Sequence, residues 1–455
     1  MHIAQYLRDF LDSLPASKRY VVGYSGGLDS QVLLHTLHSL NLHLAAVHIH
    51  HGLSPRADQW AEFCQAQCAA LQVPCTVVRV SVPADGSGLE AAARTARYAA
   101  LEQHLGADEI LLTAHHQDDQ AETLLLMLLR GAGVTGLASM PRWRPFARGL
   151  LARPLLDIPR AALHAYALQH GLAWVDDESN FDTSLKRNYL RHEILPRLIK
   201  SWPTALQTLA RAAAHLAEAD GLLAELAEMD IEQVRGSRPD TLSITGLQKL
   251  SAARRRNVLR HWLRQLALPL PDTSQLQRLE QDMFTTRADA SPQVNWSGIE
   301  TRRYRDDLYA MKPLPSAPEI ELPWDLSKSL LLPDGRRLQA VPAIGEGLSL
   351  ERLQDTHISV RFRRGGERCA PVGRGHSHEL KKLFQESGVP PWERDRVPLI
   401  FVDDQLAQVV DYWICTAFAA KREEEGWCCR LIARADIASQ GEKQDNCPGL
   451  FSSSP

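Results

Sequence analysis

The stretch Tyr20-Val21-Val22-Gly23-Tyr24, followed directly by Ser25-Gly26-Gly27-Leu28-Asp29-Ser30, decides the fold. Its first half has the pattern of a short buried strand, and the apolar periodicity that begins at Gln31 predicts a helix. Between them, two adjacent glycines allow a close backbone approach to an anion, and serine hydroxyls and helix amides can donate to it. The lysine and spacing of a Walker loop are absent. The stretch therefore predicts a phosphate-binding turn, although a glycine turn with an N-capping aspartate has the same pattern.

Beyond this turn, apolar strands and amphipathic helices alternate as far as Arg130. The patterns predict strands at Tyr20–Tyr24, Leu44–Ile49, Cys75–Val80 and Glu109–Thr113, and helices that begin at Ser30, Arg56, Gly88 and Gln117. This alternation is typical of parallel βαβ units, so we expect an α/β fold with a doubly wound parallel sheet. Ligands of such sheets bind at the carboxyl ends of the strands. Polar clusters that follow a strand are therefore the first candidates for a functional site.

The rest of the chain separates into further units. Leu150–Leu156 has the pattern of an edge strand, Pro159–Gly171 that of a helix with proline at its first position, and Trp202–Ile231 that of a long connecting helix. Residues 240–311 are helical and then β-like, and residues 359–433 mix both patterns. We predict a catalytic α/β domain over residues 1–200, a mainly helical middle domain over 201–330, a small α+β domain over 353–436 and a disordered tail over 437–455.

The composition is that of an ordinary globular protein, with 455 residues of which 44% are hydrophobic and 23% charged. No apolar run approaches the roughly 18 residues of a membrane helix, and the amphipathic start lacks a basic leader. We therefore expect a cytoplasmic protein without membrane contact. Eight cysteines without a CxxC pair argue against a zinc ribbon or a disulfide framework and are expected to be reduced. The formal net charge of -3 averages over all surfaces and does not exclude local basic patches.

An acidic cluster follows the fourth predicted strand, in the stretch His115-His116-Gln117-Asp118-Asp119-Gln120-Ala121-Glu122. Because Glu122 comes three residues after Asp119 on a predicted helix, the two carboxylates share a face and can hold an ammonium group. Asp118 can share a Mg²⁺ ion with Asp29. The alternative is that Asp118 and Asp119 only cap the helix and complement its dipole.

Two further clusters have ambiguous patterns. His48-Ile49-His50-His51 follows the second predicted strand, and without a nearby cysteine or carboxylate it favours a nucleotide-contacting or solvated loop over a metal site. Arg94 and Arg97 lie one helical turn apart, so both guanidiniums can clamp a phosphate. An isolated pair of this kind is more often a solvated helix face.

Two basic stretches indicate contacts to phosphates. Residues 186–200 contain five Lys or Arg and one acid, although a plain amphipathic helix would also explain them. Residues 361–396 contain nine Lys or Arg and five acids, with Phe362, Phe384 and Trp392 interleaved. Basic residues interleaved with aromatic ones are typical of an RNA surface, which this second stretch therefore predicts.

Ser25–Ser30 resembles the pyrophosphate-binding loop of the PP-loop ATP pyrophosphatases, which cut ATP between its α and β phosphates. Together with the other clusters, in their order along the chain, it resembles more specifically the long form of the bacterial tRNA(Ile)-lysidine synthases. The resemblance runs through Ser25–Ser30, His48–Ser54, Leu89–Tyr98, His115–Thr123, Arg153–Leu156, Trp174–Asn180, Arg187–His192 and Gly365–Leu399. Each motif alone is weak to moderate, whereas their ordered combination is specific. The middle of the chain resembles the family only loosely.

This resemblance implies a ligase that acts on the wobble cytidine of an isoleucine tRNA with a CAU anticodon. The C2 carbonyl oxygen of the base attacks the α-phosphate of ATP, and the lysine ε-amine then displaces AMP. The implied partners are this tRNA and L-lysine, with ATP as co-substrate and Mg²⁺ as cofactor, and a homodimer is left open. A lysine amine has an unperturbed pKa of about 10.4, so it must lose a proton before it attacks, and the sequence assigns no base to this step.

The resemblance also implies roles for individual residues. The expected ATP-binding residues are Ser25, Gly26, Gly27, Leu28, Asp29, Ser30, His48 and Arg97. The expected catalytic residues are Asp29, Arg94, His115 and Asp118, of which Asp29 and Asp118 hold Mg²⁺. Asp119 and Glu122 are expected to bind the lysine ammonium. The expected tRNA contacts are Lys186, Arg187, Arg191, Arg363, Arg364, Lys381 and Lys382.

Other functions are compatible with such a glycine loop. A PP-loop tRNA thiolase is the main alternative, but it needs cysteines for sulfur transfer or an iron–sulfur cluster, and Cys64, Cys68 and Cys75 lack paired spacing. A non-catalytic RNA-binding module would not need the intact acids described above. Ligases that use ammonia need a domain or partner that produces it, and the residues before Ser25 contain no such domain. Pyrophosphate release separates the enzymes from the binding module.

Overall fold

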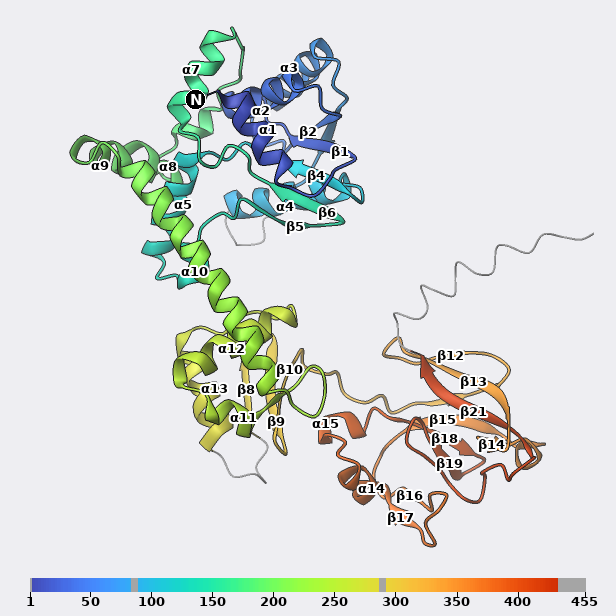
Figure 1. The fold of residues 1–455 in the computed structure, drawn as a ribbon. Coiled ribbons are helices and arrows are strands. Elements are labelled where there is room, and N and C mark those ends of the chain that lie inside the picture. Colours follow the sequence, from blue (N-terminus) through green and yellow to red (C-terminus); the bar gives the residue numbers. More distant parts are fainter. Residues whose placement is uncertain (1, 83–88, 286–291, 433–455) are drawn as a thin grey trace, which may run out of the picture. The chain divides into compact units, whose positions relative to one another are not determined.

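The computed structural model describes residues 2–82, 89–285 and 292–432 (Figure 1). The chain divides into two compact units, Met1–Met229 and Asp230–Pro455. The helix start predicted at Gly88, the tail predicted over 437–455 and the last residues of the domain predicted to end at 436 lie outside the described residues. No helix within these ranges has both the length and the apolar content that a membrane span requires.

A six-stranded sheet forms the centre of the first unit. In spatial order its strands are β3 (Cys75–Arg79), β2 (Leu44–His50), β1 (Arg19–Gly23), β4 (Glu109–Leu112), β6 (Gly149–Ala152) and β5 (Trp143–Phe146). All neighbours pair in parallel except β5, which runs antiparallel to β6. The predicted doubly wound parallel sheet is therefore confirmed. The chain moves outward from β1 through β2 and β3 and then places β4 on the other side of β1, and such a switch point is where these sheets bind ligands.

The edge strand predicted at Leu150–Leu156 is wrong in two respects. β6 ends at Ala152, and it is an inner strand because β5 covers its outer side. The sequence of β5 is Trp143-Arg144-Pro145-Phe146, in which a proline and a charged residue hide the strand pattern. A proline is tolerated there because an edge strand leaves one row of backbone groups unpaired.

Helices cover both faces of this sheet (Figure 1). α1 (Ile3–Asp12), α2 (Leu28–Ser39) and α7 (Arg160–Gln169) share a core with Val22 and Leu112 of the strands. Their neighbours Val21 and Leu111 belong to a second core, to which α4 (Leu89–Gln103) contributes. Successive strand residues thus point to opposite buried faces, as expected of a sheet covered on both sides. α3 (Ala57–Ala70) joins the first core, and α5 (Gln117–Leu129) follows β4.

The later helices of the first unit lie close to prediction. The helix predicted at 159–171 is α7, for which Pro159 is the N-cap rather than the first helical residue. It is followed by η1 (Glu178–Phe181), α8 (Lys186–Tyr189), the π-helical turn η2 (Leu190–Ile194) and α9 (Leu195–Ser201). The long helix predicted at 202–231 is α10 (Ala205–Gln233), which crosses from the first unit into the second.

The second unit begins with helices packed against a small sheet. The helices are α11 (Ile244–Lys249), α12 (Ala252–Gln265) and α13 (Thr273–Thr285). The antiparallel sheet has the order β7 (Leu242–Ser243), β10 (Asp307–Met311), β9 (Ile299–Tyr304) and β8 (Gln293–Trp296). Trp262, Leu279 and Trp296 belong to their common core. The predicted change from helical to β-like structure near residue 294 is confirmed.

The C-terminal part contains two larger sheets. One has the order β11 (Glu321–Pro323), β15 (Ile358–Phe362), β18 (Pro398–Val402), β19 (Gln405–Val409) and β20 (Trp413–Ile414). The other has the order β12 (Leu330–Leu331), β13 (Arg337–Ile344), β21 (Glu425–Ile432) and β14 (Leu348–Ser349). A short pair, β16 (Arg368–Cys369) and β17 (His378–Glu379), precedes α14 (Leu380–Glu386) and α15 (Pro391–Arg394).

Strands before residue 353, the predicted start of this part, belong to both sheets. β13 pairs with β21 along its whole length, and β11 pairs with β15. The prediction misses β11 to β14. β11, β12 and β14 have only two or three residues, which carry too little alternation to be found in a sequence, and β13 is interrupted by Pro342. The predicted boundaries of the other domains stay predictions.

Two sequence-based interpretations of the C-terminal part are wrong. Phe362 and Phe384, predicted to alternate with basic residues on an RNA surface, are core residues, and Trp392 is partly buried. Cys369 and Cys415 form a disulfide, whereas all cysteines are expected to be reduced from the sequence. These two cysteines lie 46 residues apart in the chain, so local spacing cannot indicate the pair that the fold brings together.

Candidate active site

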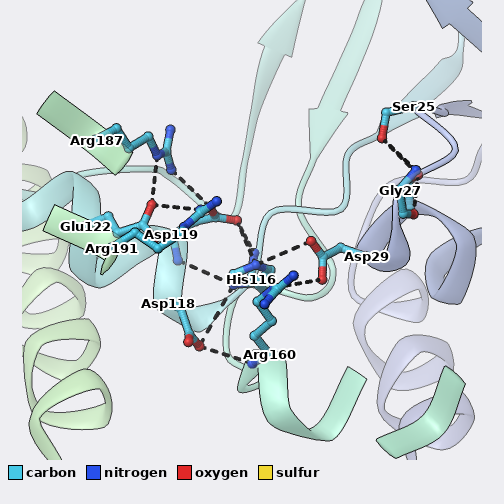
Figure 2. Close-up of polar contacts among 11 residues, drawn as sticks. Ser25, Gly27, Asp29, His116, Asp118, Asp119, Glu122, Arg160, Arg187 and Arg191 are labelled. Carbon is cyan, nitrogen blue, oxygen red and sulfur yellow. Dashed lines mark hydrogen bonds and ion pairs between the residues drawn. The ribbon is translucent and has the colours of Figure 1, made fainter. Parts of the chain in front are cut away.

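The turn between β1 and α2 is held together by its own serines (Figure 2). Ser25 Oγ lies 3.1 Å from Ser30 Oγ and accepts from the backbone N–H of Gly27 at 3.3 Å. Ser30 Oγ also donates to the carbonyl of Gly27 at 3.0 Å. Because Gly27 is the N-cap of α2, the unpaired amides of the first helical turn point out of this helix end. The turn therefore has the geometry of a phosphate cradle, at the switch point of the sheet.

Gly26 is the position of the turn where only glycine fits. Its φ is +82°, and a Cβ added there would lie 2.8 Å from Cys64 Sγ. Gly26→Ala is therefore expected to lower the free energy of unfolding by about 1–3 kcal/mol, measured by urea unfolding, and to weaken binding of ATP, the ligand that the resemblance implies.

Gly27→Ala is the matched control for this substitution. Gly27 has a φ of -73°, and a Cβ there would meet no atom closer than 3.5 Å. A second variant, Gly26→Ala with Cys64→Ala, removes the steric contact and should recover part of the loss. Equal effects of Gly26→Ala and Gly27→Ala would contradict the conformational requirement at Gly26.

His48 and Cys64 support this turn from the core. The Nδ1–H of His48 donates to the carbonyl of Tyr24 at 3.0 Å and lies 3.3 Å from Cys64 Sγ. Burial lowers the pKa of His48 and raises the pKa of Cys64 to about 12, so both side chains are neutral. In this structure His48 supports the turn from the core, in place of the predicted contact with ATP. Its ring is buried and hydrogen-bonded to the carbonyl of Tyr24, just before the turn.

Asp29, in the first turn of α2, has one carboxylate oxygen without a hydrogen-bond partner. This atom, Oδ1, is buried, and Arg160 Nε lies 3.9 Å from it. The other oxygen, Oδ2, lies 3.5 Å from His116 Nε2. A buried anionic oxygen left unpaired beside a phosphate cradle fits the needs of a divalent cation, which prefers carboxylate and phosphate oxygens.

Asp118 does not lie beside Asp29 as a second ligand for such a cation. Asp118 Oδ1 accepts from the backbone N–H of Arg160 at 3.1 Å and lies 3.9 Å from His116 Nδ1. Asp29 approaches the other nitrogen of the same ring (Figure 2). The predicted pair of Mg²⁺ ligands, Asp29 and Asp118, is therefore not formed in this arrangement, because Asp118 anchors the first turn of α7 instead.

His116, rather than the predicted His115, is the histidine at the centre of this site. It is the N-cap of α5, and its backbone N–H donates to Asp119 Oδ2 at 3.0 Å. Burial disfavours a charged ring, but the carboxylates of Asp119, Asp29 and Asp118 outweigh burial and raise the pKa of His116. His115 lies 2.9 Å from Thr113 Oγ1, and burial lowers its pKa to about 3, so its ring is neutral.

Asp119 and Glu122 form the predicted acidic pocket on α5, and two arginines fill it (Figure 2). Arg187 donates through Nε to Glu122 Oε2 at 2.8 Å and through a terminal nitrogen to Asp119 Oδ1 at 3.1 Å. Arg191 donates through Nε to Glu122 Oε1 at 2.6 Å and also reaches Asp119 Oδ1 at 3.1 Å. Glu122 is only 1% exposed. The pocket therefore contains two carboxylates and two guanidiniums that neutralise each other.

The predicted tRNA contacts at Arg187 and Arg191 are not available in this conformation. Their side chains are 22% and 28% exposed and are paired with the acids of α5. Burial alone would lower the pKa of each guanidinium, but Asp119 and Glu122 outweigh it and raise both values. Conversely, burial would raise the pKa of Asp119, but the charges of His116 and Arg187 outweigh it and lower that value. Asp119 and the two arginines are therefore ionised at neutral pH.

Arg94 and Arg97 lie on α4 around Tyr98 rather than in the acidic pocket. Their guanidinium carbons are 5.1 Å and 5.7 Å from the centre of the tyrosine ring. Burial lowers the pKa of His51, and the charge of Arg97 lowers it further. The roles expected for both arginines toward ATP stay predictions.

The remaining predicted tRNA contacts differ in exposure. Lys186 in the first unit is exposed, as are Arg364, Lys381 and Lys382 in the second. Arg363 instead pairs with Asp395 at 2.7 Å, and its side chain is largely buried. The lysines of α14 are therefore the clearest candidates for phosphate contacts in the second unit.

Sequence reasoning misses His116 and Arg160. A signal for His116 is present, because an acid three residues after a polar residue, at the start of a helix, is the pattern of a capping box. That pattern is usually sought with serine or threonine in the first position. Nothing local indicates that Arg160 approaches Asp29, since the two residues are far apart in the sequence.

Comparisons with known proteins cover nearly the whole chain. Residues 1–198 match the PP-loop domain family, residues 242–309 the TilS substrate binding domain and residues 358–433 the TilS substrate C-terminal domain. The tRNA(Ile)-lysidine synthase of Coxiella burnetii is 44% identical, over 92% of this chain and 95% of its own. Those of Alkalilimnicola ehrlichii and Serratia proteamaculans are 46% and 42% identical, over 90% and 91% of this chain and 92% and 95% of their own.

Proposed function

Because this chain belongs to the tRNA(Ile)-lysidine synthase family, we propose that it ligates lysine to C2 of the wobble cytidine in tRNA(Ile) with a CAU anticodon. The product is lysidine, and the enzyme is an ATP-dependent ligase that forms a carbon–nitrogen bond. The thiolase alternative is not favoured by these relatives. The observation that supports the proposal best is that His116 lies between Asp29 of the phosphate cradle and Asp119 of the acidic pocket. Adenylation of the cytidine needs the phosphate cradle, and the attack by lysine needs the acidic pocket. Because both steps act on the same base, the cradle and the pocket must lie side by side.

In the first step, the C2 carbonyl oxygen of the cytidine attacks the α-phosphorus of ATP, a P–O bond forms, and pyrophosphate leaves with the electrons of the broken bond. The amides at the start of α2, with Ser25 and Ser30, hold the phosphates, and Arg94 and Arg97 add positive charge. Asp29 would hold Mg²⁺, because its buried Oδ1 has no hydrogen-bond partner. When bound, Mg²⁺ neutralises phosphate charge. Within the described ranges, no three His, Cys, Asp or Glu side chains form a complete metal site.

In the second step, the lysine ε-amine attacks C2, a C–N bond forms, and the C–O bond to AMP breaks. Asp119 and Glu122 bind the amino group, where Arg187 and Arg191 now make their ion pairs. Lysine then joins these guanidiniums at the two carboxylates rather than displacing them. Their positive charges disfavour an ammonium at this position and so favour the neutral amine that the reaction needs, which carboxylates alone would not do.

Exposed basic residues are the proposed tRNA contacts, namely Lys186, Arg364, Lys381 and Lys382. A tRNA substrate implies that the reaction takes place in the cytoplasm. The homodimer left open by the sequence stays a prediction.

Removing both lysines of α14, by Lys381→Ala with Lys382→Ala, is expected to weaken tRNA binding and to leave ATP binding unchanged. Each lysine that contacts a phosphate releases about one counterion, so the slope of log affinity against log salt should fall by about 1 to 2. Filter binding over a salt series measures this slope. Lys328→Ala is the control, because Lys328 is exposed but pairs with Asp325. An unchanged slope in the double variant would remove α14 from the tRNA surface.

The proposed function is tested by pyrophosphate release in the absence of lysine. We expect release from ATP to require the tRNA with a CAU anticodon and to stop after about one turnover per enzyme, because the adenylated base has no acceptor. A tRNA in which the wobble cytidine is replaced by guanosine should support no release. Equal release with the two tRNAs would contradict a reaction at this base.

A further inference from the structure

Residues 174–192 connect the two halves of the proposed site. Near one end of this segment, the backbone N–H of Val175 donates to the carbonyl of Gly26 in the phosphate cradle at 3.0 Å. Near the other end, Arg187 and Arg191 contact Asp119 and Glu122. The residues between these contacts therefore link the phosphate cradle to the acidic pocket.

Phe181, in the middle of this segment, is held out to solvent by a rigid backbone. Its side chain is 68% exposed, although a free loop would gain stability by turning a phenyl ring inward. The buried Asn188 holds the backbone on both sides of this ring, because its Nδ2 donates to the carbonyls of Ser179 and Asp182 at 2.8 Å and 3.0 Å. Asp177 caps the same turn by accepting from the backbone N–H of Ser179 at 2.9 Å.

Two more contacts fix the surroundings of this ring. His192 stacks on Phe181, with ring centres 5.6 Å apart and planes inclined by 26°. His192 Nε2 donates to the carbonyl of Asn180 at 2.8 Å, which sets the orientation of the imidazole. Glu178 forms an ion pair with Arg56, at the start of α3. Phe181 and His192 therefore form a prearranged aromatic pair whose phenyl ring remains open to solvent.

Four acids, Asp176, Asp177, Glu178 and Asp182, lie beside Phe181 in the sequence, whereas cations follow it along the next helices. Residues 186–200, which begin five residues after Phe181, contain five Lys or Arg and a single acid. Lys186, Arg197 and Lys200 are exposed, and so is the ring of Tyr189. Exposed aromatic rings beside cations are the way proteins bind unpaired bases, which stack on the ring while the cations meet the phosphates.

We propose that Phe181, supported by His192, stacks the middle adenine of the CAU anticodon and so places the neighbouring wobble cytidine in the site. The proposal rests on the proposed function, because it takes this anticodon as the substrate. The reacting cytidine must lie between the phosphate cradle and the acidic pocket. The base next to it in the anticodon then lies at residues 174–192, the segment that contacts both the cradle and the pocket. A purine also offers a larger face for stacking than a pyrimidine.

The test uses the full chain with Phe181→Leu, which keeps an apolar side chain but not a flat ring, and with Phe181→Trp, which keeps the ring. Phe181→Leu is expected to raise the KM for tRNA about tenfold or more, the usual effect of losing one stacking partner, with unchanged KM values for ATP and lysine. Phe181→Trp should restore the wild-type value. Leu168→Ala is the control, because Leu168 is an exposed apolar residue on α7, outside the segment.

A second readout follows the base itself. With 2-aminopurine in place of the middle adenine, binding to the wild type should quench the fluorescence, and binding to Phe181→Leu should not. A KM for tRNA in Phe181→Leu equal to that of the wild type, or no quenching at saturating wild-type protein, would overturn the proposal. Failure of the proposed function gives a different result, since wild-type protein would then not transfer lysine to the tRNA at all.

Discussion

Glu122→Ala is expected to abolish lysine transfer and to lower the free energy of unfolding by about 3–5 kcal/mol, the usual cost of breaking a buried ion pair from one side. Glu122 is almost fully buried and accepts from both Arg187 and Arg191. Without it, two partly buried guanidiniums face the single carboxylate of Asp119, and the site loses an anion that would bind the lysine amine. Urea unfolding measures the first effect, and labelled lysine in the tRNA measures the second.

Two further variants make this expectation specific. Glu122→Gln keeps the shape of the side chain, so it should fold even if Glu122→Ala does not, and it should still lose lysine transfer. Glu193→Ala is the matched control, because Glu193 forms a surface pair with Arg197 at 3.4 Å and should cost less than about 1 kcal/mol. Normal lysine transfer by Glu122→Gln would show that the acidic pocket does not bind the substrate.

Asp29→Asn is expected to reduce tRNA-dependent pyrophosphate release by about 100- to 1000-fold, a loss typical of removing one stabilising group from a charged transition state. The effect on the free energy of unfolding should be small, within about 0.5 kcal/mol, because Asp29 Oδ1 has no hydrogen-bond partner and its ionic contacts, to Arg160 and His116, are long at 3.9 Å and 3.5 Å. Stopped-time assays of pyrophosphate and a urea titration give the two values. The substitution therefore separates the chemistry at this position from stability.

Asp118→Asn is the comparison for Asp29→Asn. Asp118 accepts from the backbone N–H of Arg160, so its amide variant should lose about 1 kcal/mol of stability and much less activity than Asp29→Asn. If the two variants lose activity equally, both carboxylates take part in the reaction, and the arrangement in which Asp118 only anchors α7 is contradicted.

The central sheet could be predicted from the sequence, whereas its edge strand β5 could not. β1, β2 and β4 are buried on both faces, so their apolar runs end close to the observed bounds. β5 contains an arginine and a proline and lies at the edge, where burial imposes no regular pattern. Between residues 321 and 349, β11 pairs with β15, and β13 and β14 pair with β21. These partners are distant in the chain, so local pattern does not show the strands.

The candidate site could be predicted where its residues follow a strand. Asp29, Asp119 and Glu122 come just after β1 and β4, and position alone indicates them. A local excess of basic residues predicts tRNA contacts at Arg187 and Arg191. Such an excess does not show that acids about 70 residues away in the sequence pair with these two arginines. The resemblance implies His115 as the catalytic histidine, and only the fold shows that Asp29 and Asp119 approach the neighbouring ring of His116 instead.

The most direct test of the account is to incubate the full chain with ATP, Mg²⁺, labelled lysine and tRNA(Ile) bearing a CAU anticodon, and to count the products. We predict one lysine in the RNA for each AMP and each pyrophosphate released, with the label on the wobble cytidine. Pyrophosphate release that depends on the tRNA but leaves no lysine in the RNA would contradict the account. It would point to a different nucleophile, and so to the thiolase alternative.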